Sequence, residues 1–407
     1  MTGASVAAST GLDLVYVGTL PPYPGGSGFS GLQLLTGLAR SGHAVRALAP
    51  VTPETLEYTR RFDAAHGELD ITRFVVPYFD VAPPIPPLAE YRALERQRIQ
   101  HALPALIRTR TPQLILIGRE SFAWDVPEIA RAHDIPAVLM VRGGSRTARL
   151  LGGEWPTALA MGFLAECRKV QRLVTVGRHL ETGFRGLGLD KIETIPNAVD
   201  LSQFAPWPKS ERLQREMGIA PPCVVAMHVA NLREWKRSGD LVESARATLQ
   251  AEPRLAYVIV GDGPSRAAME QACRDLGIAD RFHYAGWVEY DRIPDFINMA
   301  DVVIMPSQSE GLARVYVETQ ACGRVLIASD IPAAREVIVH GETGLLFRLA
   351  DVADLTAKTV LAARDPALRA RIGQKARERA KAFSLDAAVA RYEAVLEGVV
   401  RLNGARQ

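Results

Sequence analysis

The sequence predicts an α/β protein built from two doubly wound domains, each a parallel sheet with helices on both faces. Three observations lead to this prediction. The chain has 407 residues, which is more than one hydrophobic core commonly serves. Short apolar runs of strand length alternate with segments of helical periodicity. This alternation stops at the proline-containing residues 196–208 and then begins again, which indicates a second domain of similar design.

The first half contains apolar runs that are continuous, without the alternation of a half-exposed strand. Such runs are typical of parallel strands that are buried on both faces. A glycine- and proline-rich loop is expected at residues 21–28, and a helix at residues 32–40. The expected strands of this half are residues 12–18, 43–49, 73–79, 113–118, 137–141 and 173–176.

The second half repeats this design. Helical patterns at residues 239–249, 265–276 and 315–322 separate its apolar runs. Two such domains in tandem enclose a cleft lined by the carboxyl ends of their strands, where open α/β sheets bind ligands. The expected strands are residues 223–229, 256–261, 282–286, 302–306, 325–329 and 345–347.

We place the domain boundary near residue 205. An N-terminal domain then spans residues 1–204 and a C-terminal domain spans residues 205–382. The remaining segment, residues 383–407, contains a helical pattern whose apolar side is expected to pack back across the domains.

Composition argues against several classes of protein. The formal net charge of +3 is too small to indicate a nucleic-acid partner by itself. The four cysteines form no C-x-x-C pair, and reduced buried thiols are expected. No apolar run approaches the ~20 residues that span a bilayer, and the first residues lack the features of a signal peptide. We therefore expect a cytoplasmic protein, with at most weak peripheral association with the inner face of the membrane.

The most informative segment is residues 305–318, where an expected strand ends in a loop and a helix follows. Backbone N–H groups at the start of this helix, around Arg314 and Val315, would have no partner within it and would point into the cleft. A helix N-terminus carries about half a positive charge and binds phosphate well. Glu310 and Glu318 could accept hydrogen bonds from sugar hydroxyls. Two surface glutamates placed by chance are the alternative.

Glu310 and Glu318, with seven residues between them, resemble the E-x7-E motif of the retaining glycosyltransferases of family 4, which have the GT-B fold. The resemblance covers nearly the whole C-terminal half and is weaker in the first half. It implies two Rossmann-like domains that face each other across a cleft. Further segments resemble the family in the expected order, namely residues 195–200, 260–264, 284–286, 335–338 and 341–346.

The resemblance also implies roles for these residues. Glu318 would hold the ribose of a nucleotide-diphosphate sugar, and Glu310 would contact the transferred sugar. The backbone N–H groups of Arg314 and Val315 would bind the diphosphate. No cofactor is implied besides the donor substrate itself.

In such enzymes a basic pair after the first strand of the C-terminal domain grips the diphosphate. We assign this role to Arg233 and Lys236, because fixed cations stabilise the charge that builds on the leaving diphosphate. Asn231 stands where many relatives have arginine. Arg237 is therefore a second candidate for the diphosphate-binding role that we assign to Arg233. A cationic loop exposed to solvent is the alternative for these residues.

Two glycine pairs are candidates for donor binding, because glycine lets the backbone approach a phosphate or a sugar closely. Gly25 and Gly26 correspond to the family's glycine loop, for which a flexible loop without a ligand is the alternative. Gly261 and Gly263 follow an expected strand, where a simple tight turn explains them nearly as well.

Arg142 stands at the end of an expected strand, where many relatives place a histidine close to the reacting centre. Arginine cannot act as a base at neutral pH, but it could pair with a phosphate or with an anionic sugar. The acceptor is expected to touch N-terminal-domain loops at residues 21–28, 81–87 and 142–156.

No metal is expected, because the sequence has neither an Asp-x-Asp segment nor a cluster of ligands with metal-binding spacing. The resemblance implies that protein cations and helix dipoles replace the Mg²⁺ of other transferases.

Together these features predict a retaining, metal-independent glycosyltransferase that moves a hexosyl or related group from a nucleotide-diphosphate sugar to a hydroxyl acceptor. The acceptor could be a saccharide, a lipid-linked compound or a small molecule, and no nucleic acid is expected. No carboxylate nucleophile is evident, so front-face attack assisted by the leaving phosphate is the preferred mechanism. Two alternatives stay open, a nucleotide-sugar 2-epimerase of the same architecture and a non-catalytic nucleotide-sugar-binding protein.

Overall fold

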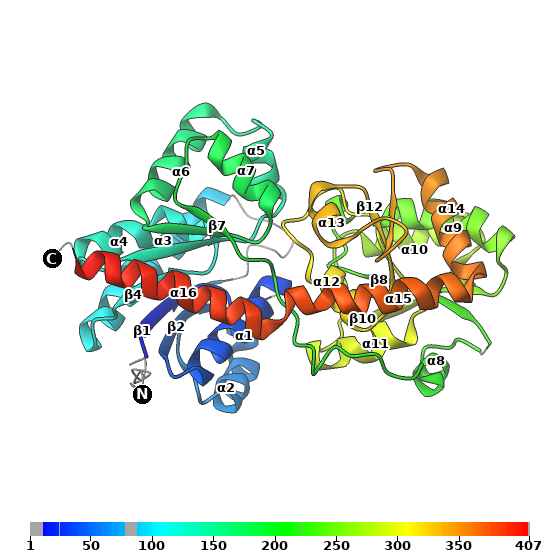
Figure 1. Ribbon diagram of the computed structural model, residues 1–407, viewed down its shortest axis with the longest axis horizontal. Coiled ribbons are helices and arrows are strands. Elements are labelled where there is room, and N and C mark those ends of the chain that lie inside the picture. Colours follow the sequence, from blue (N-terminus) through cyan, green and yellow to red (C-terminus); the bar gives the residue numbers. More distant parts are fainter. Residues whose placement is uncertain (1–10, 24, 78–87, 221, 406–407) are drawn as a thin grey trace, which may run out of the picture.

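The computed structural model describes residues 11–23, 25–77, 88–220 and 222–405. It contains two sheets, one of seven strands and one of six, and every strand pairing in these residues is parallel. Each sheet is covered by helices, and the two domains lie side by side (Figure 1). The predicted α/β fold of two doubly wound domains is therefore confirmed. The expected acceptor loop at residues 81–87 lies outside the described residues.

The N-terminal sheet has the strand order β3-β2-β1-β4-β5-β6-β7. Its central strands are wholly buried apolar runs, such as Leu-Ile-Leu-Ile in β4 and Ala-Val-Leu-Met-Val in β5, as expected for parallel strands covered on both faces. The strands are β1 Asp13–Val17, β2 Ala44–Val51, β3 Asp70–Val75, β4 Leu114–Ile117, β5 Ala137–Val141, β6 Arg172–Thr175 and β7 Ile192–Thr194.

Helices connect these strands and cover both faces of the sheet. The first helix begins at Gly26, several residues before its expected start, because Gly25 caps it with a φ of 100°. The α-helices are α1 Gly26–Arg40, α2 Leu56–Ala65, α3 Leu88–Thr109, α4 Val126–Ala132, α5 Ser145–Leu151, α6 Thr157–Lys169 and α7 Arg178–Gly186, with short 3₁₀ turns at η1 Pro53–Thr55 and η2 Glu120–Trp124.

The C-terminal sheet has the order β10-β9-β8-β11-β12-β13. Its strands are β8 Val224–Val229, β9 Leu255–Val260, β10 Phe282–Gly286, β11 Val302–Met305, β12 Val325–Ser329 and β13 Leu345–Phe347. Its helices are α8 Glu211–Glu216, α9 Ser238–Ala251, α10 Arg266–Asp275, α11 Ile293–Met299, α12 Arg314–Ala321, α13 Pro332–Val337, α14 Val352–Arg364 and α15 Pro366–Ala380, with 3₁₀ turns η3 Glu234–Lys236, η4 Ala279–Arg281, η5 Tyr290–Arg292 and η6 Lys381–Phe383.

The last helix, α16 (Leu385–Gly404), leaves the C-terminal domain and packs on the N-terminal one (Figure 1). Its buried side chains, among them Val389 and Leu396, belong to the same apolar cluster as the inner face of α1. Contact with α1 is close, since a Cβ on Gly37 would lie 2.4 Å from a methyl group of Val389. Backbone hydrogen bonds of Val199 to Phe383 and Leu385 hold the crossover in place. No helix in the described ranges has the length and apolar character needed to cross a bilayer.

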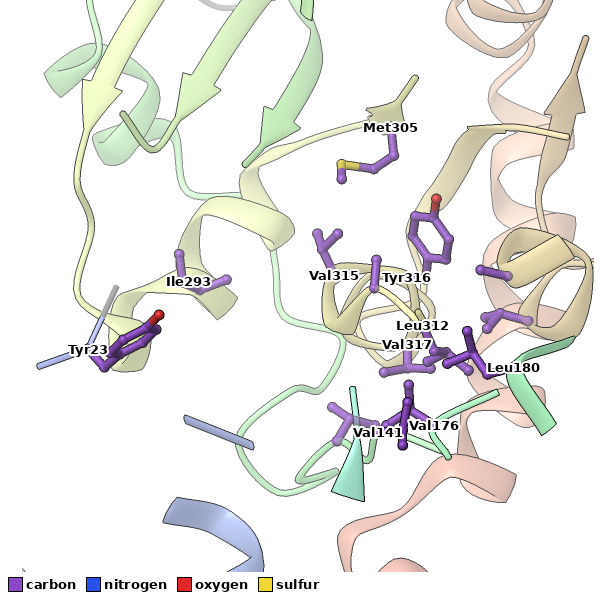
Figure 2. Close-up of a cluster of buried hydrophobic side chains, with 14 of the residues drawn as sticks. Tyr23, Val141, Val176, Leu180, Ile293, Met305, Leu312, Val315, Tyr316 and Val317 are labelled. Atoms are coloured by element: carbon purple, nitrogen blue, oxygen red, sulfur yellow. The ribbon is translucent and has the colours of Figure 1, made fainter. Parts of the chain in front are cut away.

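The two domains also meet through apolar side chains beneath α12. Figure 2 shows Val141 and Val176 of the N-terminal domain next to Val317, with Leu180 beside Leu312. All five side chains are buried in one cluster that runs through both domains. This contact brings the carboxyl ends of the two sheets face to face, which is where the fold class places a ligand.

Candidate functional site

A pocket with a volume of about 340 Å³ lies between the two domains, at the carboxyl ends of their strands. We call it the donor pocket. Loops after β5, β8, β9 and β11 and the starts of α1 and α12 contribute to its walls. The predicted site residues that line it are Gly25, Gly26, Arg142, Lys236, Gly261, Glu310, Arg314, Val315 and Glu318.

The positive end of α12 faces this pocket. Its cap residue, Ala313, offers no side-chain hydrogen bond, and its first turn has no acidic residue. The backbone N–H groups of Arg314 and Val315 have no acceptor in the part of the chain that the structure describes. All three residues line the pocket. Uncapped N–H groups and the helix dipole together form a site suited to an anion.

Glu318 lies on the same helix and is held by a buried network. Its Oε1 accepts hydrogen bonds from Arg314 Nε at 3.1 Å and from the Tyr290 hydroxyl at 2.9 Å. Arg314 also bonds to Tyr290, and it reaches across the interface to Gln33 at 2.9 Å and Ser30 at 3.3 Å on α1. Burial raises the pKa of Tyr290 well above its ordinary value, so its hydroxyl remains a donor. The network orients the carboxylate, and its Oε2 atom accepts no hydrogen bond from the described residues.

Lys236 and Glu310 form an ion pair inside the pocket. Their Nζ and Oε1 atoms are 2.6 Å apart, and the side chains are only 13% and 11% exposed. Lys236, which was predicted to bind the diphosphate, and Glu310, which was predicted to contact the sugar, therefore neutralise each other's charge. A bound diphosphate would compete with Glu310 for the ammonium group.

Arg142 projects from the end of β5 and joins the two domains through Asn197. Its Nη1 donates to Asn197 Oδ1 at 3.3 Å, and Asn197 Nδ2 donates to the Leu312 carbonyl at 2.7 Å. Within the described residues Arg142 pairs with no carboxylate. The charged residues that line the pocket are three cations and two carboxylates, a net charge of +1, which favours an anionic ligand. These residues are Arg142, Lys236, Arg314, Glu310 and Glu318.

The glycines of the pocket permit close backbone approaches. Gly261 has a φ of 111°, and a Cβ there would lie 2.0 Å from the Ala230 carbonyl oxygen. Gly263 does not line the pocket, and a Cβ on it would lie 2.6 Å from the Leu232 carbonyl oxygen. Packing of the β9 loop on the β8 loop therefore explains both residues. A Cβ on Gly26 would lie 3.3 Å from the side chain of Arg314, so the start of α1 is close to that of α12.

Gly311 has a structural role that the sequence did not reveal. A Cβ at this position would lie 1.9 Å from the Arg142 carbonyl oxygen, across the domain interface. Gly143 also packs closely on Gly311, because a Cβ on Gly143 would lie 2.7 Å from the Gly311 Cα. Glycine next to Glu310 thus lets the two domains touch backbone to backbone.

The structure does not bring Arg233 into the donor pocket. The turn η3 sends Lys236 into this pocket, whereas Arg233 lines a neighbouring hollow and lies over the ring of Trp235, 5.3 Å from its centroid. Arg237, the second candidate for this role, has a left-handed backbone conformation, and its Nε lies 2.7 Å from Oδ2 of Asp240 in an ion pair. Of the three basic residues in this loop, Lys236 alone lines the donor pocket.

Several pocket residues were missed at the level of sequence. Tyr290 and Trp287 follow β10 by a few residues, and only the general rule that ligands bind after strand ends could have indicated them. Asn197 lies within the segment that resembles the family's interdomain signature. Gln33 does not line the pocket but accepts a hydrogen bond from Arg314; it lies in the middle of α1 and carries no sequence signal of this role.

The described residues include no group of three or more His, Cys, Asp or Glu side chains that could hold a metal ion. His228 is buried, donates from Nδ1 to the Ile304 carbonyl and accepts from Ser238. Burial lowers its pKa to about 4. These contacts indicate a structural role for this histidine.

Two protein families match the chain, one for each domain. The family described as Glycosyltransferase Family 4 matches residues 24–203, and the family described as Glycosyl transferases group 1 matches residues 210–379. Similar curated proteins include N-acetyl-alpha-D-glucosaminyl L-malate synthase of Bacillus anthracis, 25% identical over 94% of this chain and 96% of that protein. The D-inositol 3-phosphate glycosyltransferase of Geodermatophilus obscurus is 31% identical over 67% of this chain and 62% of that protein.

Solved structures show the same fold. HepE of Anabaena, in complex with UDP and glucose, has a TM-score of 0.77 at 17% identity and covers 95% of this chain and 100% of its own. Sucrose-phosphate synthase of Thermosynechococcus elongatus has a TM-score of 0.80 at 18% identity, with 96% and 100% covered. With both domains matched in order and the two glutamates in one interdomain pocket, the resemblance stated from the sequence is confirmed: the chain belongs to the family 4 glycosyltransferases of the GT-B fold.

Proposed function

We propose that this glycosyltransferase moves a sugar from a nucleotide-diphosphate sugar to a hydroxyl acceptor, with retention of anomeric configuration and without a metal ion or other cofactor. One observation carries the proposal. The uncapped start of α12 faces a pocket of net positive charge, and Glu318 lies on the same helix. A diphosphate at the helix start would place its nucleoside within reach of that carboxylate.

We propose a uridine nucleotide as the first donor to test. Solved structures of HepE with this fold hold UDP or UDP-glucose, and the Bacillus anthracis relative is named for the transfer of N-acetylglucosamine. Trp287 is 55% exposed and lines the pocket, so its ring could cover a flat nucleobase. UDP-glucose and UDP-N-acetylglucosamine are therefore the first candidates, followed by GDP- and ADP-sugars.

The chemistry assigns a part to each charged group. As the bond between the anomeric carbon and the diphosphate oxygen breaks, negative charge builds on the leaving group, and Lys236 and the N–H groups of Arg314 and Val315 stabilise it. The acceptor oxygen forms its bond to the anomeric carbon on the same face, and its proton passes to the departing phosphate. Both carboxylates of the pocket, Glu310 and Glu318, already accept from cations, which argues against either as a covalent nucleophile.

A thermal-shift screen against UDP-, GDP- and ADP-sugars tests the donor, because a ligand that binds the native state raises its apparent stability. Incubation of the preferred donor without acceptor then separates the remaining alternatives. An altered sugar in the donor would indicate an epimerase, and binding without either hydrolysis or transfer would indicate a non-catalytic protein. With an acceptor, retention requires that the product keep the donor's anomeric configuration, which NMR of the product reports. No stabilisation by any nucleotide sugar would refute the proposal.

A further inference from the structure

Arg314 is a buried cation whose partners come from both domains. Its side chain is 7% exposed, so its N–H groups depend on acceptors within the protein. In the C-terminal domain its Nε donates to Glu318 at 3.1 Å, and its Nη2 donates to the Tyr290 hydroxyl. On α1 of the N-terminal domain, Gln33 Oε1 accepts from Nη2 at 2.9 Å and Ser30 Oγ accepts from Nη1 at 3.3 Å. Separation of the domains would remove these last two partners.

Tyr290, the second group that holds Glu318, is also in contact with α1. Its ring stacks on that of Phe29, with the ring centroids 4.6 Å apart and the planes inclined by 26°. The guanidinium of Arg314 lies over the same tyrosine ring, 4.6 Å from its centroid. A stacked ring and a cation over a ring face both constrain the orientation of the phenol. Both hydrogen bonds that the Glu318 carboxylate accepts from the described residues therefore come from groups that α1 helps to hold in place.

Contact between the domains therefore affects the donor pocket. α1 reaches the two groups that hold Glu318 only when the N-terminal domain lies against the start of α12. Gly26 permits this approach, since a Cβ on it would lie 3.3 Å from the Cδ atom of Arg314. Without α1, the guanidinium of Arg314 would lose two acceptors that fix its position, and the carboxylate beside it would be held less firmly. By linkage, a ligand that binds the oriented carboxylate also favours contact between the domains.

We propose that Gln33 is a positioning residue for the nucleotide donor. It holds Arg314, which in turn orients Glu318 toward the ribose, so the ribose site is complete only when the two domains are in contact. This inference rests on the proposed function, in which Glu318 binds the ribose. Gln33 does not line the donor pocket, whereas Phe29 and Ser30 do. An effect of Gln33 on donor binding is therefore indirect, which makes this residue the one to test.

The test compares two ligands of the full chain by titration calorimetry: the nucleoside diphosphate that the donor screen selects, with UDP as the first choice, and inorganic pyrophosphate. Gln33→Met keeps a side chain of similar length and removes the oxygen that accepts from Arg314. The nucleotide should bind this variant about tenfold more weakly, the low end of what a hydrogen bond to a charged group contributes. Pyrophosphate, which has no ribose, should bind as it does to the unmodified protein. Gln33→Glu keeps an acceptor oxygen and should retain the nucleotide affinity.

A double-mutant cycle shows whether Gln33 acts through Glu318. In Glu318→Gln the ribose contact that Gln33 supports is already weakened, so the further change Gln33→Met should weaken nucleotide binding by much less than it does in the unmodified protein. The matched control is Thr36→Val, one turn along α1. Its Oγ1 has no hydrogen-bond partner in the described residues, and the residue does not line the donor pocket. The control should bind both ligands normally, and thermal unfolding verifies that every variant folds.

The outcomes separate this inference from the proposed function. Unchanged nucleotide binding in Gln33→Met would overturn the positioning role and leave the proposed function intact. Equal weakening of the nucleotide and pyrophosphate would also overturn it, because a general disturbance of the pocket would then explain the effect. Full additivity with Glu318→Gln would show that Gln33 acts by another route. If UDP, GDP and ADP all failed to bind the unmodified protein, the proposed function and this inference would both be refuted.

Discussion

Replacement of Glu318 by glutamine is the sharpest test of the donor pocket. The change keeps the shape of the side chain and removes its charge. A hydrogen bond to a charged group contributes about 1.5–3 kcal/mol and a neutral one about 0.5–1.5 kcal/mol, so one ribose contact should lose about 1–1.5 kcal/mol. Nucleoside diphosphate binding should therefore weaken about tenfold.

Titration calorimetry with two ligands separates the ribose from the diphosphate. UDP contains both, whereas inorganic pyrophosphate lacks the ribose. For Glu318→Gln we expect the Kd of UDP to rise about tenfold and that of pyrophosphate to stay unchanged, because in the proposed site pyrophosphate would contact only the start of α12 and Lys236. Equal weakening of both ligands, or of neither, would refute the assignment of Glu318 to the ribose.

The same variant has a predictable cost in stability. Arg314 and Glu318 form an ion pair whose side chains are 7% and 5% exposed. Removing the negative partner of a buried pair costs about 3–5 kcal/mol when a charge is left buried, and glutamine retains part of the hydrogen bonding. We therefore expect a loss at or below about 3 kcal/mol in the free energy of unfolding. The binding measurements belong at a temperature well below the lowered Tm.

Three further predictions follow from the same geometry. Lys236→Ala should lower kcat about 100- to 1000-fold with a smaller effect on the donor KM, because it removes a cation that the leaving group needs most in the transition state; steady-state kinetics in which KM alone changed would contradict this. Gly311→Ala should lower both Tm and kcat, since its Cβ would lie 1.9 Å from the Arg142 carbonyl, whereas Gly239→Ala, whose Cβ meets nothing within 4 Å, is the matched control. Burial lowers the pKa of His228 from 6.5 to about 4, so the unfolded chain binds the additional proton between these values and the free energy of unfolding should fall by about 3 kcal/mol as pH drops from 6.5 to 4. In His228→Gln that part of the pH dependence should be absent from denaturant unfolding curves, and an unchanged slope would count against the argument.

Much of the fold could be predicted from local patterns. Buried parallel strands such as β4 and β5 are continuous apolar runs of four or five residues, a length and pattern typical of strands covered on both faces. β7 was missed, because it has three residues and only Ile192 is fully buried. The early start of α1 was also missed, since two glycines and a serine in its first turn give little helical signal.

The residues of the candidate site also fall into those that local sequence patterns could predict and those that they could not. Glu310 and Glu318 could be found from their spacing, because one strand, one loop and one helix carry both residues. Tyr290 and Gln33 could not, because Tyr290 reaches Glu318 from the turn η5 only when the C-terminal domain has folded, and Gln33 reaches Arg314 from α1 only when the two domains have met.

By itself the sequence determined the two α/β domains, the family and the helix that faces the donor pocket. These depend on periodicity and on residues close together in the chain, which local backbone geometry translates directly into structure. The tertiary structure alone decided that Lys236 enters the donor pocket while Arg233 lines a neighbouring hollow, and that Gly311 lies against Arg142. The direction of a short turn and the contact of two domains set these outcomes, and both depend on packing between residues that are far apart in the sequence.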